Sequence, residues 1–170
     1  MRKILKTGAA TLMLTAMSAD ICAAAEQTAG CAYPVDLYAV RAAAIQQNLM
    51  TAASSCHAFP EYDRFVTQYH RGLWASDLRL EVFFSRLYGQ DGPAKYNSFR
   101  KRLANASSLQ SVNHRLTYCA NAKASFELAL GHRRKSLTAF LAARPSRAEA
   151  EFSPCIIVPR ARMSRSTGET

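Results

Sequence analysis

Cysteine is the residue type with the most specific chemistry in this chain of 170 residues. The chain has five cysteines. Cys22 lies in a segment that we expect to be cleaved off, which leaves four: Cys31, Cys56, Cys119 and Cys155. An even number of cysteines in an exported chain predicts two disulfides. A zinc site is usually built from closely spaced pairs, whereas the nearest two of these cysteines are 25 residues apart. The motif C-x-x-C-H is absent, which excludes covalently attached c-type haem.

No catalytic motif is found in the sequence. H-E-x-x-H, G-x-S-x-G, a glycine-rich phosphate loop and a dinucleotide fingerprint are all missing. The histidines His57, His70, His114 and His132 include no pair at i, i+4 spacing. We therefore predict no catalytic residues, no cofactor and no metal ion. The alternative is a site formed between helices, in which His70 or His114 would meet carboxylates and line a pocket.

Positive charge is concentrated in the second half of the chain, which has a formal net charge of +10 overall. Between Lys95 and Lys135 there are nine basic residues and a single acid, Glu127. Guanidinium groups bind carboxylate and phosphate oxygens in pairs. Two clusters are therefore candidate anion-binding residues: Arg100, Lys101 and Arg102, and Arg133, Arg134 and Lys135. The alternative is a solvated face that complements the acids of the second predicted helix.

The first 25 residues have the layout of a secretory signal peptide. Three positive charges precede an apolar stretch, 9–17, and three alanines, 23–25, supply the small residues of a cleavage site. The apolar stretch is too short to span a bilayer, and no later stretch reaches that length. We expect cleavage after Ala25 and a periplasmic or secreted protein. The residues before Cys22 are a poor lipobox, which argues against a lipid anchor.

Hydrophobic periodicity predicts helices over most of the remaining chain. Apolar residues recur in steps of three and four over 34–53 and over 61–88, with a turn at 89–93 between the second helix and the next. A third, shorter helix is expected around Tyr96, Phe99 and Leu103, followed by a polar break at 105–108. A fourth is expected over 111–143, with Val112 and Leu116 facing inward. Lys123 and Arg133 interrupt its stripe, which indicates a bend near Gly131.

Short loops between long amphipathic helices predict an all-α fold, an antiparallel bundle of about four helices over 26–143. The segment 144–170 is predicted to be an irregular tail, partly tethered through Cys155. The aromatic residues lie at helical spacing and are expected in the core: Tyr62, Phe65, Tyr69, Trp74, Phe83, Phe84, Tyr96 and Phe99.

Up-and-down topology also predicts the disulfide pairing. Cys31 precedes the first helix and Cys155 follows the fourth, so both lie at the same end of the bundle. Cys56 ends the first helix, and Cys119 lies early in the fourth, nearer the opposite end. We therefore predict Cys31–Cys155 and Cys56–Cys119.

Several short motifs, taken in order, resemble a family of small exported four-cysteine helical proteins of alphaproteobacteria. The matching pieces cover about residues 31 to 130: Cys31, Ser54-Ser55-Cys56, Tyr62-Asp63-Arg64-Phe65-Val66, 80–84, Tyr96-Asn97-Ser98-Phe99, Leu103-Ala104-Asn105 and Cys119. No function is known for that family, so the resemblance implies no functional residues. Some relatives carry the name S-adenosylhomocysteine hydrolase, but that enzyme binds NAD on a Rossmann domain, and this chain has neither the motif nor the length.

Three functions remain open at this point. The first is a non-catalytic periplasmic accessory protein that docks on another envelope component. The second is a small ligand- or metal-binding protein, or an enzyme, with a site between helices. The third is a binder of anionic polymers or lipid A through the basic face of the third and fourth helices. No nucleic-acid partner is expected, since the chain has no DNA-binding motif and is exported.

Overall fold

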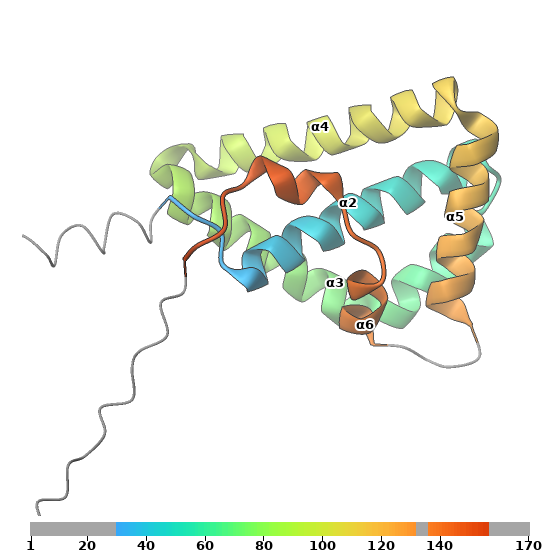
Figure 1. Ribbon diagram of the computed structural model, residues 1–170, viewed down its shortest axis with the longest axis horizontal. Coiled ribbons are helices and arrows are strands. Elements are labelled where there is room, and N and C mark those ends of the chain that lie inside the picture. Colours follow the sequence, from blue (N-terminus) through green and yellow to red (C-terminus); the bar gives the residue numbers. More distant parts are fainter. Residues whose placement is uncertain (1–29, 132–135, 157–170) are drawn as a thin grey trace, which may run out of the picture.

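Three long helices form the body of the protein in a computed structural model that describes residues 30–131 and 136–156. Helix α2 (Pro34–Ser55), helix α3 (Phe59–Tyr88) and helix α4 (Gly92–Asn113) lie side by side, and the chain reverses direction between them (Figure 1). Helix α5 (Arg115–Leu130) crosses one end of this layer and contacts all three. The predicted all-α bundle with a C-terminal segment is confirmed.

Shorter elements complete the chain. The 3-10 helix η1 (Gly89–Asp91) joins α3 to α4, and the short helix α6 (Leu137–Ala142) packs against α2 and α3. The 3-10 helix η2 (Arg147–Glu151) packs on α2. The only β-bridge in the described part of the chain pairs Ala32 with Pro154.

The core is divided into two clusters of buried side chains. The first lies where α5 and α6 meet α2 and α3, and it centres on Phe65, Tyr69 and Phe140, whose rings lie 5.2–6.0 Å apart. The second lies at the other end, between α2, α3, α4 and η2, and centres on Phe83, Phe84 and Phe99. The long amphipathic stripe of α3 contributes to both clusters, because its apolar positions recur along the whole helix.

The prediction of a break at 105–108 is wrong, because α4 continues through it. Ser107 and Ser111 lie one turn apart on the buried face of α4, where a helix usually presents apolar residues. Small polar residues can occupy a buried face when their hydroxyls are bonded, and the Ser111 hydroxyl donates to the carbonyl of Ser108. The polar stretch that suggested a loop is therefore part of a helix.

The single predicted helix over 111–143 is also wrong. The chain turns at His114, α5 ends before Gly131, and α6 is a separate helix. The side chain of Ser136 caps α6 by accepting a hydrogen bond from the backbone N–H of Ala139 at 3.1 Å, which supports a new start there. Val112 and Leu116 were expected in the core, but they are 77% and 89% exposed.

The predicted irregular tail is ordered over its described part. Cys155 donates its backbone N–H to Ala32, which in turn donates to Ser153. The Arg41 guanidinium donates hydrogen bonds to both carboxylate oxygens of Glu149 in η2, each at 2.6 Å. The ring of Phe152 packs edge-to-face against the ring of Phe83, with 5.0 Å between the ring centroids. Ala148 and Phe152 of this segment thus belong to the second core cluster.

Candidate functional site

Both predicted disulfides are present, one at each core cluster. Cys31–Cys155 joins the chain before α2 to the segment after η2, and Cys56–Cys119 joins the end of α2 to α5. They span 124 and 63 residues of sequence. Long closed loops restrict the unfolded chain most, so each bridge contributes about 4–5 kcal/mol in the chain-entropy description. The predicted signal peptide, 1–25, lies outside the described residues.

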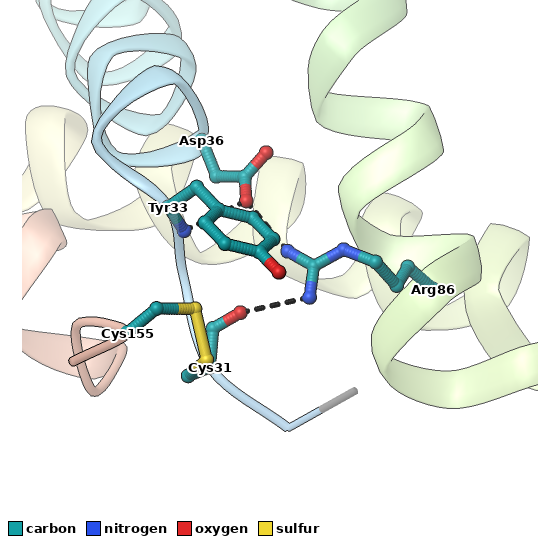
Figure 2. Close-up of a disulfide and its surroundings, with 5 residues drawn as sticks. All are labelled: Cys31, Tyr33, Asp36, Arg86 and Cys155. Atoms are coloured by element: carbon teal, nitrogen blue, oxygen red, sulfur yellow. Dashed lines mark hydrogen bonds and ion pairs between the residues drawn. A yellow bond between two sulfur atoms is a disulfide. The ribbon is translucent and has the colours of Figure 1, made fainter. Parts of the chain in front are cut away.

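A fully buried carboxylate, that of Asp36, lies in the first turn of α2 near the Cys31–Cys155 disulfide (Figure 2). One oxygen accepts from Arg79 Nε at 2.7 Å, and the other accepts from Arg86 Nη2 at 2.5 Å. The backbone N–H of Tyr33 also donates to it, at 2.9 Å. A buried carboxylate needs such partners, since an unpaired charge in the interior is strongly unfavourable.

The Arg86 side chain connects this carboxylate to the disulfide. Its second terminal nitrogen donates to the carbonyl of Cys31 at 2.9 Å, and its guanidinium carbon lies 4.9 Å from the centre of the Tyr33 ring (Figure 2). All contacts of Asp36 are therefore within the protein. The arrangement fastens the chain before α2 onto α3, and we interpret it as structural.

The first predicted anion-binding cluster is partly neutralised by acids of the protein itself. Arg100 pairs with Asp77 of α3 at 2.6 Å, and Arg102 pairs with Glu151 of η2 at 2.8 Å. Lys101 is exposed and forms no ion pair with another described residue. The second cluster, Arg133, Arg134 and Lys135, lies outside the described residues. Complementarity to Asp77 agrees with the alternative interpretation of the basic face, although Lys101 stays available to solvent.

Tyr96 is the residue whose titration is most affected by this environment. Burial and the hydrogen bond that its hydroxyl donates to Asp77, at 2.7 Å, raise its pKa to about 12. Arg100 donates to the same hydroxyl at 2.9 Å. Asp77, Tyr96 and Arg100 therefore form a hydrogen-bonded network between α3 and α4. Helical periodicity predicted a core position for Tyr96 but gave no indication of this network.

The histidines do not assemble a catalytic or metal site in the described residues. His57, His70 and His114 are exposed, and no group of three metal-ligating side chains occurs among residues 30–131 and 136–156. The predicted cluster of His70 or His114 with carboxylates in a pocket is therefore not found in that part of the chain.

A cleft of about 680 Å³ lies between the start of α3 and α5, beside the Cys56–Cys119 disulfide. Its walls are apolar, with Phe126 and Leu130 from α5. Charged side chains of both signs also line it: Glu61, Arg64, Lys123 and Glu127. None of these four is ion-paired with another described residue. Sequence analysis missed this cleft, because its residues are far apart along the chain.

The corner where α4 meets α5 carries three exposed aliphatic side chains. Leu109, Val112 and Leu116 are 62%, 77% and 89% exposed. Figure 1 shows this corner projecting at one end of the protein. We call these three residues the apolar corner. Apolar side chains gathered on a projecting surface often mark an interaction site.

The described helices include none that is long and apolar enough to cross a membrane. The chain matches no protein-family model, no curated protein and no solved structure.

Proposed function

We propose that the protein is a non-catalytic accessory protein of the periplasm that docks on an anionic lipid surface of the envelope. The apolar corner would enter the boundary between headgroups and acyl chains, and the surrounding basic residues would face the lipid phosphates. The two disulfides support an oxidising compartment. The observation that carries the proposal is the exposure of Leu109, Val112 and Leu116 within a segment that contains no acid.

The segment that carries the apolar corner has charges of one sign. Residues 92–126 include six lysines and arginines and no aspartate or glutamate. Lys101 on α4 and Arg115 at the start of α5 are both exposed and form no ion pair with another described residue. Apolar side chains beside unpaired cations are typical of surfaces that bind anionic lipid. A soluble polyanion would use the cations without needing the apolar side chains.

Vesicle flotation tests the proposal. The mature chain should float with vesicles rich in phosphatidylglycerol and much less with phosphatidylcholine, and high salt should weaken the binding because it screens the cations. Leu116→Asp should weaken binding at least about tenfold, since burying a leucine contributes about 1.5–3 kcal/mol. Ile156→Asp is the matched control, because Ile156 is also 89% exposed but follows Cys155. That cysteine is bonded to Cys31 before α2, at the opposite end of the protein from the corner (Figure 1).

Two results would overturn this function. One is that the wild-type protein stays unbound at low salt. The other is that Leu116→Asp and Ile156→Asp float equally well. If soluble polyphosphate binds as tightly as vesicles, and Lys101→Glu weakens that binding while Leu116→Asp does not, the protein is a binder of anionic polymers instead.

A second candidate function is suggested by the cleft between α3 and α5. Its apolar walls and four unpaired charges suit a small ligand that carries both charges on an apolar body, and its volume lies in the range of small-molecule sites. Titrating the protein with apolar amino acids and dipeptides by calorimetry tests this function. Binding that Lys123→Glu abolishes would support the cleft, whereas an absence of heat with every ligand would reject it.

A further inference from the structure

The outer face of α3 carries a second exposed apolar stripe. Trp74, Leu78 and Val82 follow one another at intervals of four residues, and they are 63%, 42% and 57% exposed. Residues four apart lie on the same side of a helix. Trp74 was expected in the core, and that prediction is wrong. The stripe lies opposite the buried positions of α3, so it does not contribute to the interior of the described part of the chain.

Opposite charges flank Trp74 and Leu78 of this stripe along the helix. Arg71 precedes Trp74 by three residues, and Glu81 follows Leu78 by three. Both are exposed, and neither forms an ion pair with another described residue. The order along the face is therefore Arg71, Trp74, Leu78 and Glu81, with its midpoint at position 76, and Val82 lies beyond Glu81.

We propose that this face is a homodimer interface in which α3 packs antiparallel against α3 of a second copy. In the register centred on position 76, Trp74 lies opposite Leu78 of the partner subunit. Arg71 then lies opposite Glu81 of the partner subunit, and each contact occurs twice because the twofold axis repeats it. The spacings of three and four are those of the a and d positions that meet when two helices pack.

Charge complementarity is what selects a second copy as the occupant. The face is self-complementary only in the antiparallel orientation, because a parallel pair would place Arg71 beside Arg71 and Glu81 beside Glu81. A single helix face buries less area than a standard interface. We therefore expect a weak dimer, formed at about micromolar concentrations and above. The interface is on α3, so it is independent of the lipid-binding function proposed for α4 and α5.

Trp74 is the single tryptophan of the chain and reports directly on this interface. Sedimentation velocity over a concentration series should show a monomer–dimer equilibrium for the mature protein in solution. The tryptophan emission should shift to shorter wavelength in step with dimer formation, because pairing removes the ring from water. Leu78→Glu places two like charges beside the axis and should weaken the dimer at least about tenfold. Met50→Glu, a matched change at an apolar residue of α2 that is 45% exposed, should leave the dimer unchanged.

A charge exchange tests the register. Arg71→Glu and Glu81→Arg should each weaken the dimer, and the double variant should restore it, because the exchanged pair is again complementary. Circular dichroism and the intact mass with both disulfides confirm that each variant is folded. A monomer at every accessible concentration overturns the proposal, and so does a dimer that Leu78→Glu leaves intact. A double variant as weak as either single variant rejects the antiparallel register.

Discussion

Replacing Asp36 by Asn removes one negative charge from the interior while keeping the shape of the side chain. Asp36 is fully buried, and its carboxylate accepts from Arg79, Arg86 and the backbone of Tyr33. The amide retains one acceptor oxygen, but its NH₂ group would point at a guanidinium donor. Both arginines then lose the carboxylate with which each forms an ion pair.

The size of the effect follows from burial. Breaking a buried ion pair by removing one partner costs about 3–5 kcal/mol. The side chains of Arg79 and Arg86 are 38% and 25% exposed to solvent, so water can partly replace the lost carboxylate. We therefore expect the lower end, about 3 kcal/mol. For a domain of this size that corresponds to a fall in Tm of about 10 °C.

The assay is chemical and thermal unfolding of residues 26–170 followed by circular dichroism, with both disulfides verified by mass. Asp77→Asn is the matched control, because it removes the same charge from an ion pair with Arg100 that is 41–42% exposed. Exposed pairs contribute at most about 1 kcal/mol. A loss below about 1 kcal/mol for Asp36→Asn, or one no larger than that of Asp77→Asn, would refute the reasoning.

Two further changes should alter stability in defined ways. Gly92→Ala should cost about 1–3 kcal/mol in denaturant unfolding, because its Cβ would lie 2.7 Å from the backbone Cα of Ser85; Gly30→Ala, with open space around it, should be neutral, and equal losses would contradict this. The ion pair with Arg41 lowers the pKa of Glu149 below 4.5. Its contribution to stability is therefore present above pH 4.5 and is lost as the pH falls through the lowered value. Glu149→Gln should flatten this part of the stability–pH profile, and an unchanged profile would contradict the assignment.

Where the sequence predicted well, the signal was local and repeated. The stripes of α2 and α3 are long, so their period identifies the helices and most of the core residues. The pairing of Cys31 with Cys155 followed from chain reversal at short loops, because reversal places the start of the first helix and the end of the last at the same end of the bundle. Prediction was worst between positions 105 and 143, where buried serines and exposed leucines contradict the usual relation between hydrophobicity and burial.

For the surface, too, the sequence predicts which residues are present but not which neighbours they contact. The cations of residues 92–126 are evident in the sequence, but their availability is not. Arg100 is neutralised by Asp77, whereas Lys101, its neighbour in the chain, forms no ion pair with another described residue. Whether a cation forms an ion pair depends on the helix face that it occupies and on the residues of other elements that pack against that face. Trp74 shows the converse, because helical spacing alone gives no indication of whether a second element covers the ring.

The sequence by itself determined the cysteine count, the helical class and the approximate ends of α2 and α3, because these depend on residues within a few turns of one another. The burial of Asp36 was decided only by the tertiary structure. An acid in the first turn of a helix is ordinarily a solvated partner of the helix dipole. Here its partners Arg79 and Arg86 come from 43 and 50 residues away, and only the packing of α3 against α2 brings them within hydrogen-bonding distance.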